Sequence, residues 1–289
     1  MILRIRLWLI VSLATMAASA AVIVLLRPVW GVDFTGGTLL QVATSAEQQP
    51  AEVSRLLQRE LAYASTVQSG EGKQLFIRTA PLNEAQHQEV LRVLRERAGM
   101  TEELRYESIG PTIGAELRRK ALYAMVISLA VLIAYMAYTF RSTGGLVSAW
   151  KLGIAAIVAL VHDLLFVTAV FVILGRWFNA SIDTLFLTAQ LAIFGYSVND
   201  TIVIFNRFKI DWQRLRAGHL LETLDGAVRG CLTRSLHTAI TTLLVLLALL
   251  FFGGSTVRWF VVALTAGTVV GAYSSLFVAP PVLYYLTKR

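Results

Sequence analysis

The chain has 289 residues, of which 56% are hydrophobic and only 15% are charged. About a quarter of the residues in soluble domains are charged, so this composition argues against a purely soluble protein. The formal net charge is +8 at pH 7, but Lys and Arg cluster just outside the long hydrophobic runs, as membrane orientation requires, and we expect no nucleic-acid binding.

Six hydrophobic runs are long enough to cross the ~30 Å hydrocarbon layer of a bilayer. The first, Leu7 to Leu26, contains Ala18-Ser19-Ala20, the small-residue pattern of a signal-peptide cleavage site. Its 20 uncharged residues exceed the roughly 7 to 15 of a signal-peptide core. We therefore interpret residues 1–30 as an uncleaved transmembrane anchor.

Residues 31–116 form a more polar segment between the first two hydrophobic runs, and we expect a small folded domain there. Strand patterns occur at Thr38 to Val42, Ser65 to Gln68, Gln74 to Arg78 and Leu104 to Ile109. Pro50 opens one helix, and Leu91, Leu94 and Ala98 mark one face of a second. The order βαββαβ predicts a ferredoxin-like or similar α+β sandwich.

Residues 117–289 hold the other five runs, at about 121–140, 152–174, 184–205, 233–252 and 260–286. We therefore predict an α-helical polytopic membrane protein with six transmembrane helices, whose two termini lie on the same side. Placing that side in the cytoplasm puts most of the flanking Lys and Arg inside, among them Arg4, Arg6 and Lys209. The domain of residues 31–116 is then extracytoplasmic.

Ionisable residues within a transmembrane helix are costly, so each is a functional candidate. Asp200 lies seven residues before Arg207, hence about 10 Å from the cytoplasmic end of its helix. The fifth run is short for a crossing, so its helix should begin earlier and carry Arg234 into the same leaflet. A proton that neutralises the carboxylate would release the arginine, which describes a proton-coupled switch. A static buried ion pair that fixes helix packing is the open alternative.

Other polar or small residues in the hydrophobic runs have a simpler interpretation as packing residues. His162-Asp163 lies near the bilayer midplane, where we favour a histidine that hydrogen-bonds a neighbouring helix. His237 is either part of a proton relay or a residue at an interface of small side chains. Gly267 and Gly271 have the GxxxG spacing that lets two helix backbones approach closely.

Motifs of soluble catalysis are absent from the sequence. It contains no Walker loop, no GxSxG and no HExxH, so we set aside an ATPase and a zinc protease. Its single cysteine, Cys231, excludes an internal disulfide framework and a multi-cysteine metal site. We expect no enzymatic activity, no metal and no cofactor.

A set of motifs in a fixed order gives the chain a family resemblance. They are Gly31-Val32-Asp33-Phe34-Thr35-Gly36-Gly37-Thr38, Ile109 to Gly114, His162-Asp163, Gly195 to Thr201 with Arg207, Thr233-Arg234, Thr241 to Leu243, Phe252 to Gly254, and Gly271 to Ser275. Each motif is weak alone, but together they span nearly the whole chain. In this order the sequence resembles the SecD/SecF family of bacterial protein export, and within it the SecF subunits.

The resemblance implies a multi-pass protein of the bacterial inner membrane that pairs with SecD. Each subunit would supply six helices of a two-fold pseudo-symmetric bundle similar to the resistance-nodulation-division exporters. The complex would use the proton motive force to pull or release exported unfolded polypeptides, after the SecYEG channel and the SecA motor have started translocation. Membrane lipids would surround the bundle.

The resemblance also assigns roles to residues, position by position. Asp200 resembles the proton-path carboxylate of the family and Arg234 its arginine partner. His162, Asp163, Asn199 and His237 are candidates for the proton path or for helix packing. Asp33, Phe34, Thr35, Gly36 and Gly37 form a candidate hinge, for which a tight turn at two glycines is the simpler interpretation. Gly195, Gly267 and Gly271 are candidates for helix packing.

Two positions depart from the usual pattern. Asn206 stands where many relatives have an acid, and His237 with Ala239 replaces an apolar residue and a serine. Three other functions compete with the export role. Half of a small-molecule or lipid exporter would usually carry much larger outer domains. An intramembrane aspartyl protease would need Asp163 and Asp200 at one depth, whereas a scaffold would tolerate the loss of either charge.

Overall fold

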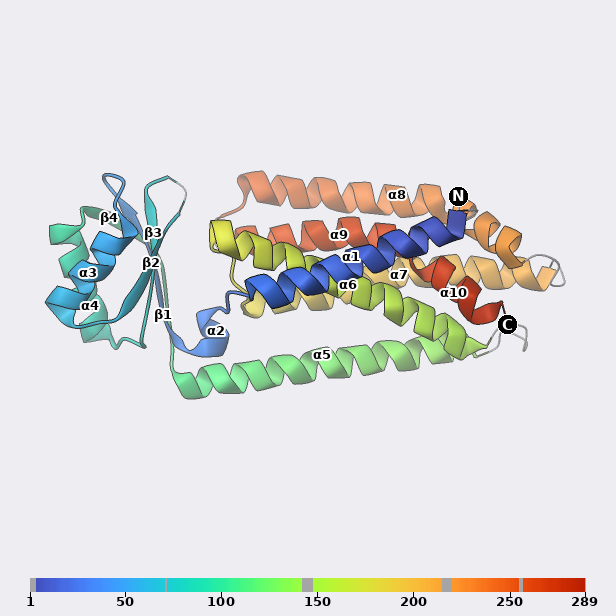
Figure 1. The fold of residues 1–289 in the computed structure, drawn as a ribbon, viewed down its shortest axis with the longest axis horizontal. Coiled ribbons are helices and arrows are strands. Elements are labelled where there is room, and N and C mark those ends of the chain that lie inside the picture. Colours follow the sequence, from blue (N-terminus) through green and yellow to red (C-terminus); the bar gives the residue numbers. More distant parts are fainter. Residues whose placement is uncertain (1–3, 71, 142–147, 215–219, 255–256, 289) are drawn as a thin grey trace. The chain divides into compact units, whose positions relative to one another are not determined.

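The computed structural model describes residues 4–70, 72–141, 148–214, 220–254 and 257–288 (Figure 1). The chain divides into two compact units. The first consists of Met1–Arg27, Ala124–Ile173 and Leu185–Arg289, and it is helical. The second consists of Pro28–Tyr123 and Leu174–Thr184, and it contains the sheet.

The second unit contains a four-stranded antiparallel sheet with two helices. Its elements are β1 (Gly37–Thr44), α3 (Pro50–Leu61), β2 (Ser65–Ser69), β3 (Gln74–Thr79), α4 (Glu84–Arg97) and β4 (Met100–Ile109). This order is the predicted βαββαβ, and the strands lie in the order β2-β3-β1-β4. The central strand β1 pairs with β3 on one side and with β4 on the other.

Local sequence signals explain where the two helices begin. Pro50 occupies the first turn of α3, where its missing N–H costs no hydrogen bond. At the start of α4, the Asn83 side chain accepts a hydrogen bond from the Gln86 N–H, and the Gln86 side chain accepts one from the Asn83 N–H. This capping box satisfies two N–H groups that the helix leaves free.

The hydrophobic core of this domain lies between the helices and one face of the sheet. It includes Leu40 and Val42 of β1, Leu75 and Ile77 of β3, Val53 and Leu57 of α3, and Val90, Leu91 and Leu94 of α4. The strand residues alternate along β1 and β3, so they point to the same face. Both helices therefore cover that face.

A short helix, α2 (Val32–Thr35), precedes β1, and two glycines join them. Gly36 has φ +71 and ψ 165, and Gly37 has φ +123, which are conformations that essentially only glycine adopts. A Cβ atom on Gly36 would lie 2.9 Å from the Cα of Pro111, the first residue of α5 (Pro111–Thr139). The turn therefore requires glycine for its backbone angles and for close contact.

We expect Gly36→Ala to destabilise this domain by about 1–3 kcal/mol, because alanine would occupy a strained backbone region and press on Pro111. The measurement is the unfolding temperature of the purified chain in detergent. Gly110→Ala is the matched control, since a Cβ there has no neighbouring atom within 4 Å. Equal unfolding temperatures for the two variants would contradict this account.

The first unit is a helical bundle. It holds all or most of α1 (Ile5–Leu26), α5, α6 (Ala149–Phe178), α7 (Thr184–Arg214), α8 (Leu220–Phe252) and α9 (Arg258–Phe277), and the shorter α10 (Ala279–Thr287). The last predicted run is divided between α9 and α10 at Val278, where Pro280 and Pro281 occupy the first turn of α10. Proline is favoured in that first turn but not inside a helix.

Within the described residues, five helical segments are long and apolar enough to cross a membrane. They are Ile5–Leu26, Pro111–Thr139, Ala149–Phe178, Leu220–Phe252 and Arg258–Thr287. The predicted run 184–205 lies in α7, which does not belong to this set. α7 carries Gln190, Ser197 and Asp200 as buried polar residues, and such side chains lower its hydropathy.

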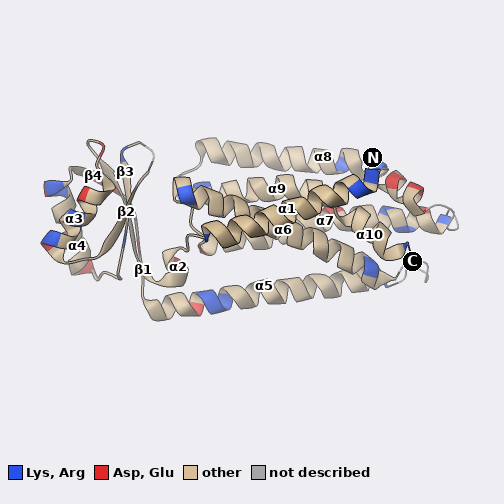
Figure 2. Cartoon of the chain, viewed as in Figure 1, with Lys and Arg blue, Asp and Glu red and all other residues tan. Residues whose placement is uncertain are grey.

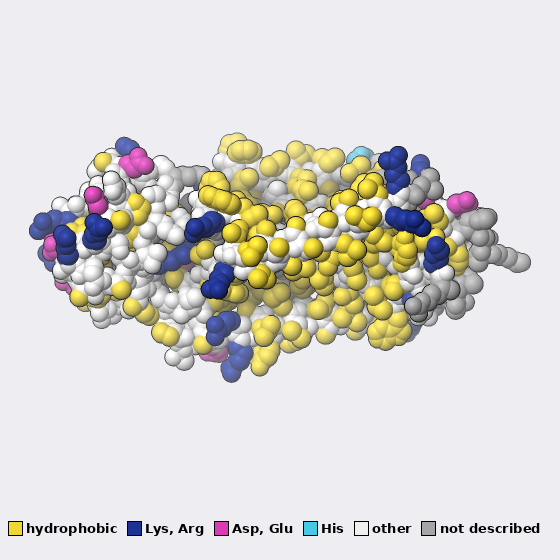
Figure 3. Space-filling model, viewed as in Figure 1, with side chains coloured by type: hydrophobic (Ala, Val, Ile, Leu, Met, Phe, Trp, Pro, Cys, Tyr) yellow, Lys and Arg dark blue, Asp and Glu magenta, His cyan; other side chains and the backbone are white. Residues whose placement is uncertain are grey.

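Large hydrophobic side chains are exposed along α1, α5 and α8. Figure 3 shows the hydrophobic surface that results. Lys and Arg gather near the ends of the long helices, as Figure 2 shows. An apolar surface with charges at the helix ends is what a bilayer requires of a polytopic membrane protein.

Candidate functional site

A buried carboxylate joins three helices inside the bundle. Asp163 of α6 is 0% exposed. Its Oδ2 accepts hydrogen bonds from the Ser197 hydroxyl of α7 at 2.6 Å and the Ser274 hydroxyl of α9 at 2.7 Å. A charged group inside a bundle is costly unless donors surround it, and these donors come from two other helices.

Ser274 has a second acceptor within reach. Its Oγ lies 3.2 Å from the carbonyl oxygen of Gly271, one turn earlier on α9. A serine hydroxyl has one proton to donate, so Ser274 can give it to Asp163 or to the backbone. If Asp163 is protonated, it can donate a hydrogen bond to Ser274, and the Ser274 hydroxyl can then donate its own proton to the carbonyl oxygen of Gly271.

His162 extends this cluster toward α1. Its Nδ1 lies 3.1 Å from Oδ1 of Asp163, and the residue is 1% exposed. Its Nε2 is buried and has no hydrogen-bond partner among the residues that the structure describes. The imidazole ring lies 5.8 Å from the ring of Tyr273, whose hydroxyl is 3.4 Å from Oγ of Ser12.

Asp200 lies one helical turn from this cluster. It follows Ser197 by three residues on α7, which places it about 4.5 Å further along the axis and on the same face. Asp200 is 3% exposed, and its buried Oδ2 has no hydrogen-bond partner within the described part of the chain. A buried acceptor without a partner is rare in folded proteins, so it marks Asp200 as a functional candidate.

Two residues of α8 lie near Asp200. They are Ser235, which is buried, and Arg234, whose positive charge acts on the Asp200 carboxylate. In the ranges that the structure describes, no ion pair within 4.0 Å joins Asp200 to Arg234. Arg234 is exposed at the surface of this chain, as are Asn199 and His237. The predicted pair is therefore close but not in direct contact.

The two glycines of the GxxxG motif bring α9 against α7. A Cβ atom on Gly267 would overlap Ile193 of α7, and one on Gly271 would lie 3.3 Å from Cβ of Ser197. This close packing places α9 next to Ser197, the residue of α7 that donates a hydrogen bond to Asp163. Gly195, by contrast, has no neighbouring atom within 4 Å of an added Cβ.

The candidate hinge belongs to the sheet-containing unit. Asp33, Phe34 and Thr35 lie in α2 and are followed by the two glycines of the turn. Oδ2 of Asp33 accepts a hydrogen bond of 2.9 Å from the N–H of Thr184, the first residue of α7. The motif therefore forms the turn between α1 and β1 and also contacts the first residue of α7.

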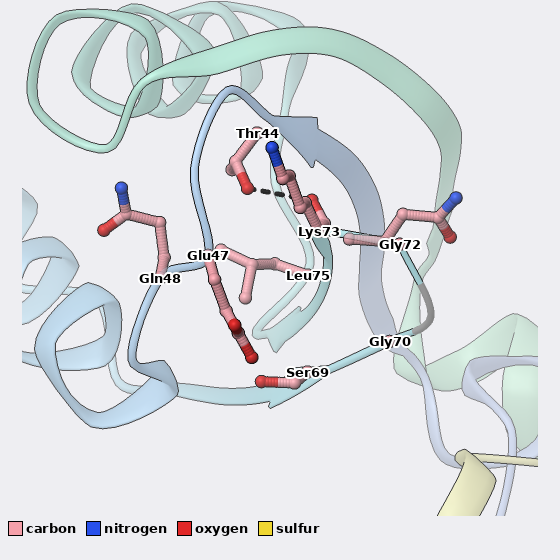
Figure 4. A pocket seen from close by; sticks show the side chains of 9 residues that line it. Thr44, Glu47, Gln48, Ser69, Gly70, Gly72, Lys73 and Leu75 are labelled. Carbon is pink, nitrogen blue, oxygen red and sulfur yellow. Dashed lines mark hydrogen bonds between the residues drawn. The ribbon is translucent and has the colours of Figure 1, made fainter.

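A pocket of about 280 Å³ lies elsewhere, in the α+β domain (Figure 4). It is lined by Thr44, Glu47, Gln48, Ser69, Gly70, Gly72, Lys73, Gln74 and Leu75, none of which is a predicted site residue. Thr44 closes one side by donating a hydrogen bond to the carbonyl oxygen of Lys73. Among the described residues, no group of three His, Cys, Asp or Glu side chains could hold a metal ion.

Two protein-family models match this chain. "Protein export membrane protein SecD/SecF, C-terminal" covers residues 89–289, which is more than half of the chain, and "SecD/SecF GG Motif" covers residues 23–47. The chain belongs to the SecD/SecF family. The resemblance inferred from the motifs is thereby confirmed, and the second match contains the Gly36-Gly37 pair.

Individual relatives place the chain among the SecF subunits of the SecD/SecF family. It is 34% identical to a protein translocase subunit SecF of Thermobaculum terrenum, over 86% of this chain and 81% of that protein. It is 34% identical to the SecF subunit of Pseudomonas aeruginosa, over 89% of this chain and 81% of that one.

Solved structures of SecDF have the same fold as this SecD/SecF family member. The crystal structure of SecDF from Thermus thermophilus, a translocon-associated membrane protein, matches 99% of the chain with a TM-score of 0.87 and 29% identity. SecDF in a super-membrane-facing form matches 96% of it with a TM-score of 0.67 and 30% identity. The chain spans 38% of the length of each of those chains.

Ser197 and Ser274 are the site residues that the sequence alone did not single out. Both lie inside quoted motifs, Gly195 to Thr201 and Gly271 to Ser275, but a serine in a helix carries no charge to mark it. Their shared contact with Asp163 depends on how three helices pack. The one available signal was that each motif holds a serine two or three residues after a glycine in a hydrophobic helix.

Proposed function

We propose that this chain is the SecF subunit of a SecD–SecF complex, which uses the proton motive force to complete the export of polypeptides. Membership of the SecD/SecF family and relatives named protein translocase subunit SecF support a role in protein translocation. The complex acts after SecA and the SecYEG channel have started the transfer. The chain itself carries out no enzymatic reaction.

The observation that supports proton coupling is the buried Oδ2 of Asp200, which has no hydrogen-bond partner among the residues that the structure describes. A carboxylate that is buried near Arg234 and Ser235 can hold or release a proton, and each state changes how α7 interacts with α8. One charge that crosses 100 mV supplies about 2.3 kcal/mol. That energy shifts a two-state helix arrangement by more than about tenfold.

SecD supplies the other half of the bundle in this proposal. The chain spans 38% of a SecDF chain, so most of that protein lies outside the match. Arg234, His237 and Asn199 are exposed on this chain alone, and contact with SecD would bury them. Part of the proton path then lies on SecD, and this chain alone does not couple protons to export.

Topology and fold complete the proposal. α7 is the fourth transmembrane helix in chain order and brings the total to six, because a helix with buried polar residues is stabilised inside a bundle rather than by lipid. The anchor is residues 1–30, the periplasmic domain is residues 31–116, and the other five helices lie in residues 117–289. Both termini lie in the cytoplasm, and lipids surround the bundle. The periplasmic domain has the ferredoxin-like fold, which the strand order β2-β3-β1-β4 supports.

The test follows a partly exported preprotein in inverted membrane vesicles with matched amounts of this chain, SecD and SecYEG. SecA is removed after translocation has begun, so that only the late step is observed. We expect a proton gradient to speed completion, and a protonophore or omission of this chain to remove that effect. Equal rates with and without the chain would overturn the proposal.

A further inference from the structure

The segment after α1 is joined to the segment before α7. The Gly31 N–H donates a hydrogen bond of 2.8 Å to the carbonyl oxygen of Ile182, and the Ile182 N–H donates one of 2.8 Å to that of Val29. Trp30 and Ile182 thereby form a short parallel bridge. A Cβ on Gly31 would lie 2.8 Å from Cβ of Asp183, so the two segments are in close contact.

Asp33 continues this contact to the first residue of α7. Its Oδ2 accepts a 2.9 Å hydrogen bond from the N–H of Thr184. The first N–H groups of a helix lack intrahelical acceptors and carry partial positive charge, so a carboxylate stabilises them. The acceptor comes from a residue 151 positions earlier in the chain, and it ties two distant segments together.

The same segment also lies against α5 and leads directly into the sheet. A Cβ on Gly114 of α5 would lie 2.8 Å from the backbone nitrogen of Gly36 and 3.4 Å from the carbonyl oxygen of Asp33. β1 begins at Gly37 and is hydrogen-bonded to β3 and to β4. Asp33 is therefore connected, through Gly36, to the central strand of the sheet.

We propose that Asp33 is the positioning residue that ties the first turn of α7 to β1, so that a displacement of α7 reaches the sheet of the α+β domain. The inference rests on the proposed function, because α7 also carries Ser197 and Asp200. Thr184 and Asp200 are 16 residues apart on one continuous helix, about 24 Å along its axis. A rigid helix transmits a movement at one end to the other, and the bond to Asp33 passes it on.

The test compares Asp33→Ala with Asp33→Asn in the vesicle assay that holds SecD and SecYEG. Alanine removes the acceptor, whereas the amide oxygen of asparagine keeps it. Glu60→Ala is the matched control, because Glu60 is an exposed acid on α3 of the same unit. Two quantities are measured in each sample, the gradient-dependent completion of export and the uptake of protons by the vesicles.

We expect Asp33→Ala to lower gradient-dependent completion by about fivefold, the factor that loss of one helix cap produces in an equilibrium, while proton uptake persists. Asp33→Asn and Glu60→Ala should match the wild type in both quantities. A parallel fall of completion and proton uptake would show a merely structural role and overturn the inference, as would an unchanged Asp33→Ala. A wild type that ignores the gradient would instead remove the proposed function, and the inference with it.

Discussion

We expect Asp200→Asn to abolish the response of polypeptide export to a proton gradient. The substitution keeps the shape of this buried side chain, so we expect the helices of the bundle to pack as before. An amide cannot take up and release a proton at this position, and the change that alters its attraction to Arg234 no longer occurs. In vesicles with SecD and SecYEG, we expect completion in the gradient to be no faster than with a protonophore. Arg234→Ala should have the same effect.

The control for this result lies on the same helix. Asp211 forms an ion pair of 2.9 Å with Arg207, one turn away on α7, at a position that water reaches. Asp211→Asn removes one negative charge from α7 without touching the buried cluster, and such surface pairs contribute little. We expect it to respond to the gradient like the wild type. If Asp200→Asn failed to co-purify with SecD, its carboxylate would have a structural role.

The α+β domain could be predicted from the sequence in detail. Its strands and helices follow from local signals, namely alternating residues in β1 and β3, Pro50 at the start of α3, and leucines at helical spacing in α4. The predicted strands differ from β1, β2, β3 and β4 by a few residues at their ends. Pairing partners within the sheet were not visible, because they depend on contacts between residues far apart in the chain.

Only the ionisable residues of the candidate site could be predicted from the sequence. Asp163, Asp200 and Arg234 stand out because ionisable residues are rare in hydrophobic helices. The sequence could not show that Asp163 accepts hydrogen bonds from Ser197 and Ser274, since helix packing decides this contact. Nor could it show that Asp33 contacts the start of α7, because the two bonded residues are 151 positions apart in the sequence.

Asp163→Asn should also remove the gradient response, and Asp163→Leu should in addition destabilise the bundle. The carboxylate is the common acceptor for the hydroxyls of Ser197 and Ser274. Asparagine keeps one acceptor oxygen, and Ser274 can turn to the carbonyl of Gly271, so the helices should still assemble. Leucine offers no acceptor, and a buried polar group left without a partner costs about 1–3 kcal/mol.

These two variants separate the chemical role of Asp163 from its packing role. The unfolding temperature of the purified chain in detergent should fall clearly for Asp163→Leu and little for Asp163→Asn, while gradient-dependent export should be lost in both. Ser274→Ala removes one donor and keeps the carboxylate, so it tests whether the hydrogen bond or the acid matters. A gradient response that survives in Asp163→Asn would make this residue a packing residue and leave Asp200 as the acid that couples protons to export.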